Sequence, residues 1–248
     1  MSELDTQDKG TDRPHDGTSR MGVRVLHALE PLALLAVPTV LVACAVLDIE
    51  RAALLSMLVA LAAIVVFFAG YEASRPALRQ IMPTVVLAAL AAAGRMLFAA
   101  IPDFKPVSAI CIIAGAVFGR RSGFMVGALA ALVSNFFFGQ GPWTPWQMYA
   151  WGLVGYGAGV LAEHDLLDKL PVLYGYGFSS ALLYGLLLNG YYVIGYVHPI
   201  TWPAIVAAYA AGLPFDIVHS VATVVFLAAL YAPWRRKLLR IKRKFALA

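Results

Sequence analysis

The amino-acid sequence predicts an all-α protein that crosses a membrane several times. Of its 248 residues, 61% are hydrophobic and only 13% are charged, and the mean hydropathy is +0.76. A soluble domain averages about 25% charged residues, so a water-soluble fold of this composition would have too little polar surface. The composition therefore places the chain among the polytopic membrane proteins.

Eight apolar stretches supply the expected helices, since a helix that spans a bilayer needs about 20 mostly apolar residues. They cover residues 31–48, 52–71, 81–100, 106–119, 122–138, 145–162, 171–195 and 212–232. The stretch at 106–119 is short, but its strongly apolar neighbours favour a crossing over a re-entrant segment.

The first two stretches differ from the other six, because they lack glycine-rich patterns and are followed by the charged connection 72–79. The sequence thus predicts a six-helix core preceded by two extra transmembrane helices. The expected parts are a disordered cytoplasmic tail at 1–22, a two-helix N-terminal extension at 23–80, the core at 81–235 and a basic cytoplasmic tail at 236–248.

The positive charges predict the orientation of the helices, because Lys and Arg concentrate in cytoplasmic loops. With the N-terminus inside, all but three of the 19 basic residues fall on the inner side. The exceptions are Arg51 and Lys105 in outer loops and Arg95 within a helix. We therefore expect a cell-membrane protein with both termini in the cytoplasm. The basic run 235–244 then faces anionic lipid, which explains it more simply than a nucleic-acid partner does.

An uncharged outer segment, residues 134–151, is the first candidate binding region. Aromatic rings alternate there with amides and a hydroxyl, and several Gly and Pro residues predict a tight path. Its candidate ligand contacts are Asn135, Gln140, Trp143, Thr144, Trp146, Gln147 and Trp151. The combination suits a large, mostly uncharged organic ligand. An interfacial aromatic belt would explain the Trp residues but not the amides clustered with them.

A second uncharged outer connection, at 191–202, adds Tyr192 and His198 to the candidates. Three ionisable residues inside helices complete them, namely Arg95, Asp216 and His219, and each must face protein or water. Pro214 is expected in the first turn of the last helix. Asp216 would then lie near the outer end, with His219 one turn deeper on the same face. We expect Arg95 to pair with Asp216, either to lock two helices together or to contact a ligand.

Rows of small residues mark helix faces where two backbones can approach closely. The rows are Gly119-Gly123-Gly127, Gly155-Gly159, Ala88-Ala92 and Ala89-Ala93. Packing within the protein is one explanation. For the alanine rows, a docking surface for another membrane protein is the other.

Sequence motifs for catalysis are absent. The chain has no phosphate-binding glycine-rich loop, zinc-protease motif or serine-hydrolase elbow. Cys44 and Cys111 have no metal-binding or disulfide spacing. The sequence therefore predicts a binding protein rather than an enzyme, with no cofactor and no metal.

These features together resemble the substrate-binding S components of energy-coupling factor (ECF) vitamin transporters. The resemblance covers about residues 81–235 and rests on the segments 92–102, 120–124, 139–147 and 212–219. The 139–147 segment is most similar to cobalamin-type members. Residues 1–80 depart from the family, because typical members have six spans rather than eight.

The resemblance implies a function. Such proteins bind one vitamin from outside and then associate with a transmembrane coupling protein and two ABC-type ATPases. The implied contacts with the coupling protein are Ala88, Ala89, Ala92 and Ala93. Cobalamin or a corrinoid precursor is the expected ligand, and riboflavin and pantothenate stay open. The alternatives from other classes are an intramembrane enzyme that uses Asp216 and His219 as an acid–base pair, and a membrane scaffold.

Overall fold

The computed structural model describes residues 16–47, 52–73 and 78–244, and over these residues the protein is all-α. Its elements are α1 (Asp16–Leu47), α2 (Ala52–Ala73), α3 (Leu78–Leu97), α4 (Val107–Phe118), α5 (Arg120–Phe138), α6 (Trp143–Glu163), η1 (Leu166–Asp168), α7 (Leu170–Tyr196) and α8 (Trp202–Lys244). Eight α-helices were expected, and the described residues form eight. The expected tail residues 1–15 and the basic residues Arg51 and Arg75 lie outside the described residues.

Several of these helices match the thickness of a bilayer. The segments long and apolar enough to cross it are Leu54–Ala73, Arg120–Phe138, Leu170–Tyr196 and Trp202–Lys244. Shorter apolar segments are Ala28–Ala43, Ile81–Leu97 and Val107–Phe118. Because about 20 helical residues span the hydrocarbon core, these helices indicate a multi-pass membrane protein.

The ends of two helices differ from the prediction. α8 begins at Trp202 rather than at 212, and Pro214 and Pro233 both lie inside it. The placement of Pro214 in a first helical turn was therefore wrong, because membrane helices tolerate internal prolines. α8 also continues through 236–244 of the expected tail. α1 begins at Asp16, so residues 16–22 are helical rather than part of a disordered tail.

The centre of the protein is α4, of whose 12 residues ten are buried. It packs closely on α5 and α6, and the glycine rows explain how these backbones approach. A Cβ atom on Gly155 would overlap the carbonyl of Gly123, and one on Gly115 would overlap the carbonyl of Gly155. Gly123, Gly127, Gly155 and Gly159 therefore serve packing within the protein, whereas Gly119 has open space around it and a φ of +89° at the turn between α4 and α5.

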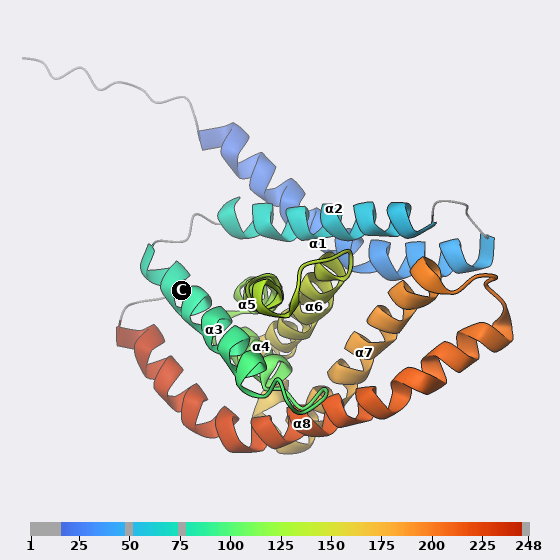
Figure 1. Ribbon diagram of the computed structural model, residues 1–248. Coiled ribbons are helices and arrows are strands. Elements are labelled where there is room, and N and C mark those ends of the chain that lie inside the picture. The colour runs from blue at the N-terminus through green and yellow to red at the C-terminus, as the bar shows by residue number, and fades with distance from the viewer. Residues whose placement is uncertain (1–15, 48–51, 74–77, 245–248) are drawn as a thin grey trace, which may run out of the picture.

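The first two helices lie against the core rather than within it. Figure 1 shows α1 and α2 side by side along one side of the core, with the long α8 along the opposite side. In this view α5 is seen nearly end-on and α2 from the side, so these two helices cross steeply. Contacts from α2 reach α5, α6 and α7, and contacts from α1 reach α7.

A proline in α1 creates one attachment between this helix pair and the core. Pro38 lies inside α1 and has no backbone N–H, so the carbonyl of Leu34 receives no helical hydrogen bond from it. The hydroxyl of Tyr149 in α6 donates to that carbonyl at 2.8 Å. The core thus satisfies the backbone acceptor that the proline leaves open.

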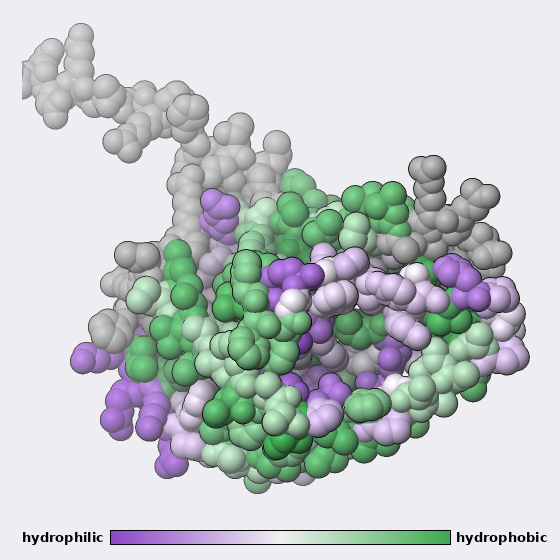
Figure 2. Space-filling view, viewed as in Figure 1, coloured by the Kyte–Doolittle hydropathy of each residue, from purple (hydrophilic) through white to green (hydrophobic). Residues whose placement is uncertain are grey.

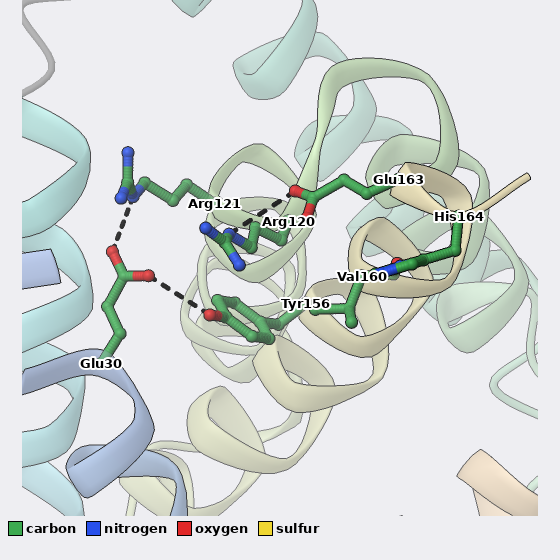
Figure 3. A network of polar contacts seen from close by, with 7 residues as sticks. All are labelled: Glu30, Arg120, Arg121, Tyr156, Val160, Glu163 and His164. Carbon is green, nitrogen blue, oxygen red and sulfur yellow. Dashed lines mark hydrogen bonds and ion pairs between the residues drawn. The ribbon is translucent and has the colours of Figure 1, made fainter. Parts of the chain in front are cut away.

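A buried carboxylate creates a second attachment (Figure 3). Glu30 of α1 is only 2% exposed, and its Oε1 accepts a hydrogen bond from Arg121 Nε of α5 at 2.6 Å. The hydroxyl of Tyr156 in α6 donates to the other carboxylate oxygen at 3.2 Å. Nearby, Arg120 and Glu163 form an ion pair at 3.5 Å that is far more exposed. The buried charge of Glu30 is therefore paired and hydrogen-bonded by the core.

Candidate functional site

A cavity of about 250 Å³ brings together the functional side chains of the core. Residues of α3, α5, α6, α7, α8 and the 98–106 loop line it: Arg95, Pro102, Asp103, Lys105, Phe138, Gln147, Trp151, Tyr184 and His219. Figure 2 shows hydrophilic residues gathered in and around a hollow near the centre of this face, within a largely apolar surface. Such a mixture of rings and a few polar groups is typical of a small-molecule site.

Arg95, two residues before the end of α3, is held firmly in this cavity. Its Nη1 donates to Ser134 Oγ and to Asn135 Oδ1, both at 2.6 Å. Its Cζ lies 4.6 Å from the ring centre of Phe138 and 4.9 Å from that of Trp151. These partners are all neutral, so they orient the guanidinium without neutralising its charge.

Behind Arg95, a network of amide and hydroxyl side chains fixes the orientation of the buried Asn135. Its Nδ2 donates to Thr144 Oγ1 at 2.9 Å and to Gln147 Oε1 at 2.8 Å. The Thr144 hydroxyl in turn donates to Gln140 Oε1 at 2.9 Å. Because both amide hydrogens of Asn135 are used, its oxygen is directed at Arg95. Four of the residues expected from the 134–151 segment thus form one network.

Aromatic rings form one wall of the cavity. The rings of Trp151 and Tyr184 stack with their centres 4.7 Å apart, and Tyr184 meets the His219 ring edge-on at 5.0 Å. Ser108 Oγ accepts a hydrogen bond from Trp151 Nε1 at 3.2 Å and lies 2.8 Å from His219 Nε2. This buried serine therefore fixes both rings, and the wall offers a flat face to a ligand.

Two charged residues of the 98–106 loop complete the lining. Partial withdrawal from water raises the pKa of the Asp103 carboxyl, against the opposing effect of Lys105 and Arg95. Desolvation likewise lowers the pKa of Lys105, which Asp103 opposes. Lys105 Nζ also donates to the carbonyl of Ile101 at 2.8 Å. With two cationic side chains and one carboxylate, the lining favours an anionic group on the ligand.

Comparison with protein families assigns the chain to a family. Residues 74–243, more than two thirds of the chain, match DUF6580, a family of unknown function. The chain belongs to DUF6580. The match includes every residue that lines the cavity and excludes α1 and α2. No curated protein and no solved structure matches the chain.

Several residues expected at the site lie elsewhere in this DUF6580 protein. Trp146 is buried and stacks on Tyr191 with the ring centres 5.6 Å apart. Trp143 packs over Gly141, Tyr192 stacks on Tyr196, and His198 is exposed in the loop before α8. None of these side chains lines the cavity. Of the expected residues, Arg95, Gln147, Trp151 and His219 do.

The expected pair between Arg95 and Asp216 is wrong. Arg95 donates to Ser134 and Asn135, whereas Asp216 Oδ2 accepts from Asn189 Nδ2 of α7 at 2.9 Å. Asp216 lines an apolar groove between α7 and α8 and is not among the residues that line the Arg95 cavity. It also makes no acid–base pair with His219, whose hydrogen bond goes to Ser108. Over the described residues, no group of three or more His, Cys, Asp and Glu side chains forms a metal site.

Five lining residues were not among the expected contacts: Pro102, Asp103, Lys105, Phe138 and Tyr184. Asp103 and Lys105 carried a signal, since they are charged residues in an otherwise charge-poor outer connection. Phe138 follows Asn135 by three residues at the end of α5, so helical spacing places both near Arg95. Tyr184 lies in the middle of α7 among apolar residues, where the sequence gives no signal.

The alanine rows of α3 face two different environments. Ala88 and Ala92 are buried within the protein, at 3% and 1% exposure. Ala89 and Ala93 are exposed, together with Val85, Val86 and Leu90. Only the Ala89 row therefore offers a free surface to another membrane protein.

Proposed function

We propose that this DUF6580 protein is the substrate-binding subunit of an ECF-type vitamin transporter. The observation that carries the proposal is the fixed guanidinium of Arg95 beside the stacked Trp151 and Tyr184 rings. A preorganised cation next to an aromatic wall binds an organic ligand that has one charged and one apolar part. The resemblance of the core to S components supplies the class of ligand.

The size and charge of the cavity favour a small vitamin among those considered. Its volume of about 250 Å³ is below the range of roughly 300–1,000 Å³ that drug-sized ligands occupy. Arg95 and Lys105 outnumber Asp103, so a carboxylate on the ligand gains attraction. Pantothenate, which carries a carboxylate and an amide, fits these conditions better than riboflavin does. Cobalamin would require the 98–106 and 139–142 loops to move apart.

The charge distribution supports an orientation for capture and release. Arg120, Lys169 and the basic end of α8 lie at the end of the bundle away from Arg95, which we assign to the cytoplasm. The cavity then opens outward, and both termini are cytoplasmic. Because the chain has no phosphate-binding loop, ATPase subunits would supply the energy through a coupling protein that docks on the exposed Ala89 and Ala93.

Vitamin binding to the purified protein in lipid nanodiscs tests the proposal. We expect submicromolar affinity for one labelled vitamin in a panel of pantothenate, riboflavin and cobalamin. Arg95→Gln should weaken binding about tenfold or more, since it removes a charge-assisted contact. Lys105→Gln, in a loop where folding is not at risk, should weaken binding of a carboxylate ligand as well. Arg236→Gln, at the exposed far end of α8, is the control and should bind like the wild type. Absence of submicromolar binding for the whole panel would contradict the proposal.

A further inference from the structure

A second recess lies at the opposite end of α3 from Arg95. It is a groove of about 340 Å³ between the first half of α3 and the C-terminal part of α8. Its lining is apolar apart from one lysine: Pro83, Val86, Leu87, Leu90, Trp234, Lys237, Leu238 and Ile241. Val86 and Leu90 are 49% and 44% exposed, so the groove opens on the surface of the bundle. Its shape and chemistry suit a hydrocarbon chain.

Positive charge surrounds the α8 side of this groove. The chain has no Asp or Glu after Asp216, and residues 235–244 contain seven Lys and Arg residues. Figure 2 shows hydrophilic residues gathered at the C-terminal end of α8, next to apolar surface. This segment therefore presents an electrostatic field that attracts anions.

Two of these cations bond to groups elsewhere in the protein, whereas Lys237 is the one that lines the groove. Arg235 pairs with Asp168 at 2.6 Å, and Lys242 donates to the carbonyl of Val117 at 2.9 Å. Lys237 instead lines the groove, one turn of helix from Trp234 and from Ile241. Tryptophan is enriched where apolar and headgroup regions of a bilayer meet. The groove thus has an apolar slot, an interfacial ring and a cation in one continuous surface.

We propose that this groove binds an anionic phospholipid. One acyl chain lies against Val86, Leu90 and Ile241, and the headgroup phosphate contacts Lys237. Basic pockets between transmembrane helices bind anionic headgroups in this way. The seven basic residues argue against a zwitterionic lipid, whose ammonium group they would repel.

Native mass spectrometry of the full chain tests the site. The detergent-solubilised protein is titrated with dioleoyl phosphatidylglycerol and, separately, with dioleoyl phosphatidylcholine. We expect retention of the first lipid at concentrations where the second is lost. Lys237→Gln should weaken retention of phosphatidylglycerol about tenfold. Arg236→Gln is the matched control, because it removes the same charge one residue earlier from an exposed position outside the groove.

A second variant separates the slot from the charge. Leu90→Trp fills the groove without altering charge, and the half-exposed position of Leu90 tolerates a larger side chain. We expect it to reduce retention of phosphatidylglycerol while α-helix content stays unchanged. Equal retention of the two lipids would overturn the proposal, because it would show that the groove does not select an anionic headgroup. Equal losses for Lys237→Gln and Arg236→Gln would also overturn it, since they would indicate attraction to the whole basic end.

Discussion

Replacing Tyr149 with Phe tests how the N-terminal helix is attached to the core. Pro38 cannot donate a hydrogen bond to the carbonyl of Leu34, four residues earlier in α1. The hydroxyl of Tyr149 donates to that oxygen at 2.8 Å, and a longer contact of 3.3 Å reaches the carbonyl of Ala33. Phenylalanine keeps the ring and removes only the donor.

The size of the effect follows from burial. Tyr149 is 0% exposed, so water cannot replace the lost hydroxyl at the Leu34 carbonyl. A buried acceptor left without a partner costs about 1–3 kcal/mol, and we expect about 1.5 kcal/mol here. Pro38→Ala returns an N–H to the helix, which lets α1 satisfy its own carbonyl. In that background, Tyr149→Phe should cost less than about 0.5 kcal/mol.

The coupling energy follows from the free energies of unfolding of four proteins in mixed micelles: the wild type, the two single variants and the double variant. The account predicts a coupling of about 1 kcal/mol between Tyr149→Phe and Pro38→Ala. An equal cost for Tyr149→Phe in the two backgrounds would refute the reasoning, because the hydroxyl would then not be serving the carbonyl that Pro38 leaves open.

Three further predictions, tested with five variants, concern packing, the buried ion pair and the charge of the cavity. Gly155→Ala should destabilise the protein by about 2 kcal/mol or more in a thermal-unfolding assay, because a Cβ there overlaps the backbone of α5. Gly175→Ala is the control, since Gly175 has open space around it, and it should be neutral or slightly stabilising. Glu30→Gln should lower the free energy of unfolding by about 2 kcal/mol, since it leaves the mostly buried Arg121 unpaired. Glu163→Gln, which removes the exposed partner of Arg120, should lower it by less than about 1 kcal/mol. Burial raises the pKa of the Asp103 carboxyl above the ordinary 3.8. Its protonation makes the cavity more positive, so binding of an anionic vitamin should strengthen as pH falls from neutral toward that raised pKa. Asp103→Asn should bind more tightly near pH 7 and lose that part of the pH dependence; an unchanged titration profile would show that Asp103 does not act on the ligand.

The number of helices followed from the sequence because apolar length is a strong signal in a bilayer. The start of α8 was predicted wrongly, because Pro214 was interpreted as the start of a helix. In a membrane protein a helix can continue through a proline, since neighbouring groups bond the backbone atoms that the proline leaves unpaired. The short α4 was the hardest to interpret from length alone. Ten of its 12 residues are buried, so the surrounding helices cover it.

The candidate site was predicted in part. The polar residues of 134–151 were expected to contact a ligand. Asn135, Thr144, Gln140 and Gln147 instead bond to one another, and of these four only Gln147 lines the cavity. The partner of Arg95 was chosen by charge, which favoured Asp216. The structure instead satisfies the guanidinium with the neutral oxygens of Ser134 and Asn135. Neutral hydrogen-bond partners leave no charge pattern in a sequence, so only the packing of α3 against α5 reveals them.

The central claim, that the Arg95 cavity holds a small anionic vitamin, is tested most directly by identifying what the protein carries from cells. The wild type and Arg95→Gln are purified in parallel from the same growth medium, denatured, and their small molecules quantified by mass spectrometry against vitamin standards. The account predicts one carboxylate-bearing vitamin in near-equimolar amount with the wild type and about tenfold less with Arg95→Gln. Finding no vitamin with either protein, or the same amount with both, would contradict it.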